Sequence, residues 1–231
     1  MKRFIVAVLL VFLCVSPVLG AGQSVSGVTA QTIIDRVKAN LNTTSSAFWS
    51  DLDLLRWMDE GVKEIQALTH AIQDTTTIEL SGNTMEYSWT GVSNYMTVEN
   101  VTYRSGASNA WSFKGLKKAT VAIIGNTSDK GPPEYWYEWD NKIGVWPKPT
   151  DAYSGNSIFV YYAPIPDGVE SGTSPIELPA MYDGPLIWYV TCFAKKREKR
   201  FEEAAVYMGR YNQILGRFRL DLVEGRSPQV Q

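Results

Sequence analysis

Apolar side chains near both ends of the chain recur every three or four residues, which is the spacing of one face of an α-helix. The spacing predicts helices over residues 28–41, 50–74, 180–196 and 201–222. Ser50 is the expected N-cap of the second helix, because its side chain can accept a hydrogen bond from a free backbone N–H. Asp53 then lies in the first turn, where a negative charge suits the helix dipole.

The third of these helices has an unusual composition. Residues 186–194 are apolar almost all round, and Pro185 fits the first turn of a helix. A helix without a polar face must be buried, either inside the protomer or between protomers. The last helix has an ordinary apolar stripe, formed by Phe201, Ala205, Met208, Tyr211, Leu215, Phe218 and Leu222.

Between the helix pairs, residues 75–162 change to the alternating pattern of β-strands. Residues 75–80 and 85–89 predict a strand, a turn and a strand, and residues 98–103 and 111–113 predict a hairpin. Asp140 and Asn141 form a favourable two-residue turn between strands at 135–139 and 142–146. Residues 158–162 predict one more strand, and residues 116–124 fit either a short helix or a strand.

The order of these elements predicts an α+β fold. Two N-terminal and two C-terminal helices would form a four-helix bundle, with a β-rich insertion between the helix pairs. Residues 23–222 are expected to form a single domain, followed by a flexible tail at 223–231. Residues 1–22 have the basic, apolar and small-residue order of a secretory signal peptide; an uncleaved apolar arm and a misassigned start codon are the alternatives.

Composition and motifs exclude several kinds of binding site and catalytic site. The 231 residues have a formal net charge of −2, so they lack the basic excess that drives nonspecific nucleic-acid binding. His70 is the only histidine, and Cys14 and Cys192 are the only cysteines, which excludes a histidine-rich metal site, a thiolate zinc site and a disulfide framework. No nucleophile elbow, P-loop or dinucleotide motif is present, and residues 125–131 are expected to be a surface loop. We therefore expect no enzymatic activity and no cofactor, and we interpret His70 as a histidine satisfied by neighbours or by solvent.

Aromatic and basic side chains are the remaining candidates for function. The aromatic residues of strands 135–139, 142–146 and 158–162 would alternate between the core and a protein interface, with stacking on sugars or bases as the alternative. The basic run at 195–200 fits a solvated turn, or a contact with an acidic partner or with passing nucleic acid. The predicted interface residues are Trp188, Tyr189, Lys196, Arg197, Tyr207, Tyr211, Trp136 and Trp146.

Several segments occur in an order that is known from one family. Residues 50–61 (SDLDLLRWMDEG) resemble its second helix, and GPPEYWY at 131–137 followed by IGVWPKP at 143–149 resembles its hairpin. The strand at 158–162 continues the likeness, as do Leu178-Pro179 with Tyr182, and Ala204-Ala205 with Tyr207 and Tyr211. Over roughly residues 28–222, and most strongly after Pro132, the chain resembles the head–tail adaptor (connector) proteins of tailed bacteriophages, especially the tail-tubular-A-like adaptors of short-tailed phages.

The resemblance implies an α-helical bundle with a β insertion. It also implies a ring, usually a dodecamer, that docks under the portal protein and joins the tail nozzle or tube. Double-stranded DNA would pass through the ring without specific binding, and no enzymatic step is implied. The chain would assemble in the host cytoplasm and belong to the virion. The alternative is a secreted or periplasmic module that binds glycans through exposed Trp and Tyr, if residues 1–22 act as a signal peptide.

Overall fold

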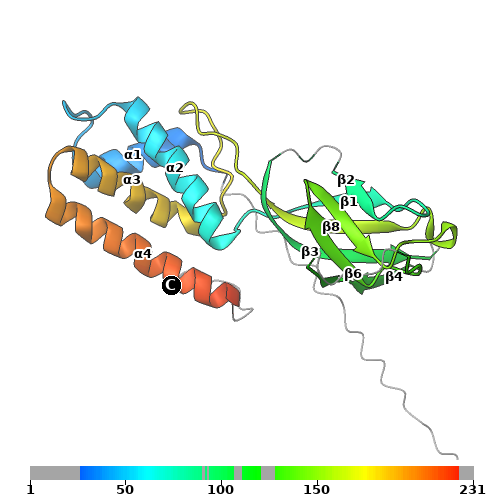
Figure 1. The fold of residues 1–231 in the computed structure, drawn as a ribbon. Helices are drawn as coiled ribbons and strands as arrows, with labels where there is room; N and C mark the ends of the chain where they lie inside the picture. The colour runs from blue at the N-terminus through cyan, green and yellow to red at the C-terminus, as the bar shows by residue number, and fades with distance from the viewer. Residues whose placement is uncertain (1–26, 90–91, 93, 107–110, 121–127, 224–231) are drawn as a thin grey trace, which may run out of the picture.

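The computed structural model describes residues 27–89, 92, 94–106, 111–120 and 128–223, and they form two lobes that lie side by side (Figure 1). The helical lobe contains α1 (Ala30–Leu41), α2 (Asp51–Thr69), α3 (Asp183–Arg197) and α4 (Phe201–Val223). The other lobe contains the strands, and each lobe has its own hydrophobic core. The signal-like segment at 1–22 and residues 224–231 of the expected tail lie outside the described residues.

Ser50 caps α2, as predicted. Its Oγ accepts a hydrogen bond from Asp53 N (3.3 Å), and Asp53 Oδ2 accepts one from Ser50 N (2.8 Å). Such a reciprocal pair satisfies two of the free N–H groups at the start of a helix. The hydrogen bond from the Ser50 backbone is the main cause that lowers the pKa of Asp53.

Helix α3 occupies the middle of the helical lobe and packs against α1, α2 and α4. Its side chains are buried around most of the circumference, from Leu186 to Lys195. Gly61 of α2 allows a close approach, because a Cβ at this position would lie 2.8 Å from Cδ1 of Tyr189. The burial that the apolar composition of residues 186–194 demands is therefore supplied within one chain.

The β lobe contains two four-stranded sheets. The first has the order β1 (Asp74–Glu79), β8 (Ser157–Pro164), β3 (Tyr95–Ser105) and β4 (Ser112–Gly115). The second has the order β2 (Glu86–Ser88), β7 (Lys142–Trp146), β6 (Tyr135–Trp139) and β5 (Lys117–Lys118). Strands β5 and β6 are parallel and the other pairs are antiparallel. Side chains of both sheets, including Val160 and Trp136, share one core.

The strand pairing agrees with the local turn signals at two places and differs at a third. Asp140 and Asn141 join β6 to β7 with φ values of 47° and 58°, as their turn requires, and β3 pairs with β4 as expected. Strands β1 and β2 do not pair with each other, because β1 pairs with β8 and β2 pairs with β7 of the other sheet. Within residues 116–124, Lys117–Lys118 forms strand β5, and residues 121–124 lie outside the described residues.

The prediction of a four-helix bundle with a β-rich insertion is wrong. In a four-helix bundle each helix turns one apolar stripe toward a shared axis. Here α3 is itself the centre, and the other three helices cover it. The strands form two sheets with a separate core, so they are not an appendage of a bundle.

The chain crosses between the lobes after α2 and again after β8, and one side chain fixes both crossings. Gln66 is buried, and its Nε2 donates hydrogen bonds to Ile72 O (2.8 Å) and Pro164 O (3.0 Å). Its Oε1 accepts a hydrogen bond from Ile72 N (2.8 Å). Close by, Nδ1 of His70 at the end of α2 lies 2.7 Å from Oε1 of Glu99 on β3, so His70 is satisfied by a neighbour as we interpreted it.

After β8, residues 165–178 run back along the helical lobe, and we name this segment the strap (Figure 1). Its carbonyl groups at Gly172 and Ser174 accept hydrogen bonds from Gln31 N and Ala30 N, both at 2.9 Å. Val169 N donates a hydrogen bond to Asp59 Oδ1 (3.1 Å). The strap is thereby fixed to α1 and α2.

Candidate interaction surfaces

Acidic side chains hold the basic turn between α3 and α4. Lys195 is buried, and its Nζ lies 3.1 Å from Glu203 Oε2 and 4.0 Å from Glu198 Oε2. Arg200 also pairs with Glu203, and the hydrogen bond from Lys195 is the main cause that lowers the pKa of the Glu203 carboxyl. Two of the five cations in this run therefore serve the fold.

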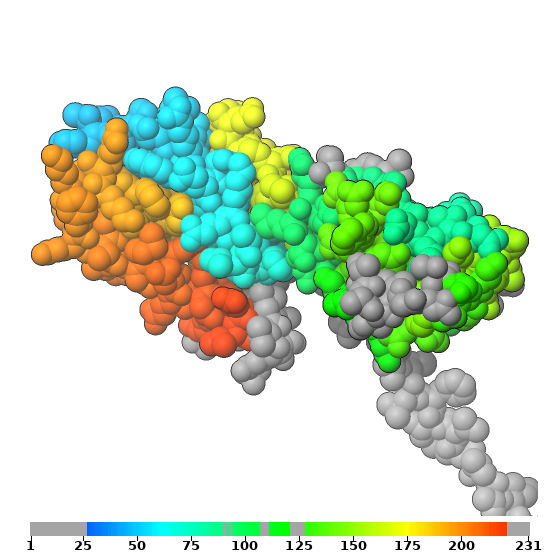
Figure 2. Space-filling view, viewed as in Figure 1, coloured from blue at the N-terminus to red at the C-terminus, as the bar shows by residue number. Residues whose placement is uncertain are grey.

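The other three cations, Lys196, Arg197 and Lys199, are exposed beside two exposed rings. Lys196 Nζ lies 4.5 Å from the ring centroid of Phe193, and Arg197 Nε donates a hydrogen bond to Phe48 O (3.3 Å). Phe48 and Phe201 are 56% and 66% exposed. We name Phe48, Lys196, Arg197, Lys199 and Phe201 the helical tip; the turn between α3 and α4 lies at the end of the helical lobe farthest from the β lobe (Figures 1 and 2).

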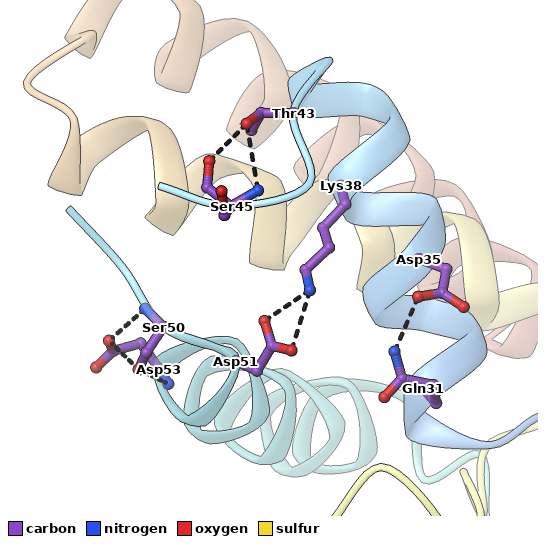
Figure 3. Close-up of polar contacts among 8 residues, drawn as sticks. All are labelled: Gln31, Asp35, Lys38, Thr43, Ser45, Ser50, Asp51 and Asp53. Carbon is purple, nitrogen blue, oxygen red and sulfur yellow. Dashed lines mark hydrogen bonds and ion pairs between the residues drawn. The ribbon is translucent and has the colours of Figure 1, made fainter. Parts of the chain in front are cut away.

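The loop that carries Phe48 is tied at several points (Figure 3). Thr43 Oγ1 donates a hydrogen bond to Ser45 O (2.5 Å), and Lys38 Nζ on α1 lies 2.7 Å from Asp51 Oδ1 at the start of α2. Trp49 Nε1 donates a hydrogen bond to Glu198 Oε1 (2.9 Å) in the α3–α4 turn. The ion pair thus joins the two helices that the loop connects, and Trp49 anchors the loop to the α3–α4 turn, which positions Phe48 against the basic turn.

Three of the predicted interface residues are buried in the cores of the chain itself. Trp136 lies in the β-lobe core, while Tyr189 and Tyr211 lie in the helical core with ring centroids 5.2 Å apart. Burial, and then the charge of Glu64, raise the pKa of both tyrosines. In this fold a partner protein cannot reach these three rings.

Three others, Trp146, Trp188 and Tyr207, are half-buried. The rings of Trp146 and Tyr135 have centroids 5.5 Å apart, and the guanidinium of Arg210 lies 5.8 Å from the Tyr207 ring centroid. Trp136 and Trp146 belong to the β lobe and the other six predicted residues to the helical lobe, so the eight do not form one site. Lys196 and Arg197 are exposed at the helical tip, and their contact with a partner stays a prediction.

An apolar cavity of about 380 Å³ opens between the start of α3 and the second half of α4. Trp188 is among its lining residues, with Met181, Ile214 and Phe218. Arg217 is the charged residue of the lining. Such a cavity can accept an apolar side chain of a partner, because burying that side chain removes apolar surface from water.

The first sheet carries exposed aromatic side chains that sequence reasoning missed. Trp111 and Phe113 are 45% and 59% exposed. Between them and β8 lies Arg104, whose Cζ is 4.0 Å from the Trp111 ring centroid and 5.0 Å from that of Phe159. Alternation showed which side chains of a strand share a face, but it could not show which face another sheet would cover.

The second sheet buries two adjacent aromatic side chains, Trp136 and Tyr137, on opposite faces of β6. The Tyr137 ring lies over Gly144 of β7, where a Cβ would be 2.0 Å from the ring Cζ. Its hydroxyl donates a hydrogen bond to Glu86 Oε1 (3.4 Å), and burial, then Glu86, raise the pKa of Tyr137 to about 12. Strand β6 is therefore covered on both faces near its centre.

The described residues form surfaces that a partner could bind, but they do not form a metal site or carry a reactive thiol. No three of their His, Cys, Asp and Glu side chains are grouped so that they could hold a metal ion. Cys192 is buried, and burial raises the pKa of its thiol, which opposes nucleophilic reactivity. Among the helices of the described segments, none combines the length and apolar composition that a membrane span requires.

Comparison with known proteins assigns the chain to a protein family. No curated protein matches the sequence. A family model described as "SU10 adaptor protein" matches residues 28–231, which is most of the chain and includes both lobes. This match favours the adaptor interpretation over a secreted glycan-binding module. The chain belongs to the SU10 adaptor family, a family of phage head–tail adaptors, and is a structural component of a phage virion.

Proposed function

We propose that the chain forms a ring between the portal protein and the tail of a phage, and that the genome passes through this ring. The family match over residues 28–231 is the observation that supports the proposal. The ring would be a dodecamer and would act as the tail-tubular-A-like adaptors of short-tailed phages do. Double-stranded DNA would move through the channel without specific binding, and the protein would catalyse no reaction.

The two lobes suit a protein with a different partner at each end. The helical tip and the exposed aromatic face around Trp111 belong to lobes with separate cores, so each surface can adapt to its partner without disturbing the other. We assign the helical tip to the portal and the β lobe to the tail nozzle or tube. The apolar helix α3 gives no independent support for a ring, because α1, α2 and α4 already bury it.

Charge reversal at the helical tip tests the assignment to the portal. The double variant K196E/R197E should lose co-sedimentation with the portal protein while its melting temperature stays within error, because both side chains are exposed. The matched control K117E/K118E makes the same charge change on exposed residues of β5 in the other lobe, and it should bind the portal normally.

Electron microscopy of portal complexes should show a collar of this protein beneath the portal. A wild-type chain that never binds the portal would refute the proposal. Normal docking of K196E/R197E combined with blocked genome ejection would instead place the tip in the channel wall.

A further inference from the structure

The solvent side of α4 carries a regular row of residues. Val206, Arg210, Gln213, Arg217 and Leu220 follow one another at steps of four and three residues, which places them on one face of the helix. All five are exposed, and the two apolar members, Val206 and Leu220, are 55% and 62% exposed. Residues 204–220 contain three arginines and no acidic residue. We name these five residues the α4 stripe.

The strap has the opposite charge. Residues 165–178 contain three acidic residues and no basic residue. Asp167 and Glu170 are exposed, whereas Glu177 accepts a hydrogen bond from Asp167 N (3.1 Å). Ile165, two residues before Asp167, is 41% exposed. The strap therefore combines exposed acids with an exposed apolar side chain, as the stripe combines arginines with Val206 and Leu220.

Within one chain these two surfaces cannot meet. The strap is hydrogen-bonded to α1 and α2, and α4 packs mainly on α3. Figure 1 shows the strap on the opposite side of the helical lobe from α4. The complementary charges can therefore be brought together only between two copies of the chain.

We propose that the α4 stripe of one copy binds the strap of the next copy. Such a contact uses different surfaces on the two partners, so it repeats from copy to copy and forms a ring where the rotation between copies closes. The cavity between α3 and α4 lies beside Arg217 of the stripe and can accept the Ile165 side chain of the neighbour. Contact between two stripes is disfavoured, because it would bring arginines together. This inference rests on the proposed ring and assigns the two surfaces that would close it.

A charge swap on the full-length chain tests the contact. Variants R210E and E170K each place like charges opposite each other, and each should raise the dissociation constant for self-association at least about tenfold. In a mixture the two variants can alternate, and every contact between them then pairs opposite charges, either the two substituted side chains or Arg210 with Glu170. The mixture should therefore associate more tightly than either variant alone. Mass photometry at low and high ionic strength measures all three.

Two control variants match the charge changes. Arg219 lies nine residues after Arg210, about half a turn away around the helix axis, so R219E makes the same change outside the stripe. Glu79 is an exposed residue of β1 in the other lobe, so E79K matches E170K. Both controls should associate as the wild type does. Equal weakening by R210E and R219E, or no recovery on mixing, would overturn the inference.

Assembled particles separate failure of this contact from failure of the proposed function. If R210E and E170K enter particles in wild-type copy number, the ring stands and the assigned surfaces are wrong. If the wild-type chain is absent from particles or present as one copy, the ring itself is wrong. A third outcome concerns DNA: the wild type could retain double-stranded DNA in a salt-sensitive way. If R210E abolishes this retention and the other variants do not, the stripe binds DNA and the inference is overturned.

Discussion

Each lobe contains a tyrosine whose ring lies against a glycine, and the two contacts depend on different kinds of information. In the helical lobe Tyr189 of α3 lies against Gly61 of α2, and in the β lobe Tyr137 lies over Gly144. The second contact follows from the register of one hairpin, because Tyr137 and Gly144 are paired residues on either side of the Asp140-Asn141 turn. The first joins helices that are distant in the sequence. Similar packing can thus be encoded locally or only through the whole fold.

The largest effect is expected from Leu215→Ala, which should affect only one of the two cores. Leu215 is 4% exposed in the helical core, so the variant should lose about 2–5 kcal/mol of unfolding free energy. Amide hydrogen exchange should become faster in α3 and α4 and stay unchanged in β3 and β8, because the cores are separate. The control Leu220→Ala removes a side chain that is 62% exposed and should change little. Equal loss of protection in both lobes would contradict this separation.

The next effect is expected from Gly144→Ala. The new Cβ would lie 2.0 Å from the Tyr137 ring Cζ, so the ring must leave its buried position. We expect a loss of about 1–3 kcal/mol, measured by chemical denaturation. The double variant G144A/Y137A should be less destabilised than the sum of the two single variants, because the clash requires the ring. Additive effects would show that the ring is not confined by Gly144.

Gly61→Ala should have a smaller effect than Gly144→Ala. Its Cβ would lie 2.8 Å from Tyr189 Cδ1 and 2.9 Å from Leu186 Cδ1, which also requires displacement. Alanine favours a helix by about 1 kcal/mol over glycine, however, and this gain offsets part of the clash. Thermal melting of both variants under one condition gives the order. If Gly61→Ala costs more than Gly144→Ala, the packing between α2 and α3 is tighter than the contact across β7.

Ser50→Ala should have the smallest effect, about 1 kcal/mol, because it removes half of a capping box. The variant should also raise the pKa of Asp53 toward its ordinary value, which NMR titration of the carboxyl measures. A lowered carboxyl pKa adds stability above the ordinary pKa of about 4, and this contribution is lost as the pH falls through the folded-state value. The difference between Ser50→Ala and wild type should therefore shrink in acid. A constant difference would mean that the charge of Asp53 plays no part.

The structure shows which features a sequence can reveal. The Ser50 cap and the Asp140-Asn141 turn were predictable, because each depends on a few adjacent residues. The separation of β1 from β2 into different sheets was not, because strand partners are chosen by long-range packing. For α3 the burial was predictable, because its composition required it. The sequence left open whether the same chain or a neighbour would cover the helix.

The candidate surfaces were less predictable than the elements. Lys196 and Arg197 are exposed, as a basic turn suggests, yet Lys195 in the same run is buried against Glu203. Tyr189 and Tyr211 were expected at an interface, but they are core residues. Phe48 and Trp111 were missed, and Phe201, which we expected on the apolar stripe of the last helix, is exposed. Exposure of an apolar residue depends on whether a neighbouring element extends far enough to cover it.

The amide of Gln66 has a mechanical consequence. A force that pulls the two lobes apart loads the two covalent crossings in parallel, one through Ile72 and one through Pro164. Because the Gln66 side chain bonds both of these backbone segments, neither can lengthen before its hydrogen bonds to Gln66 break. Tension on one crossing is thus shared with the other, and the junction resists stretching as a unit.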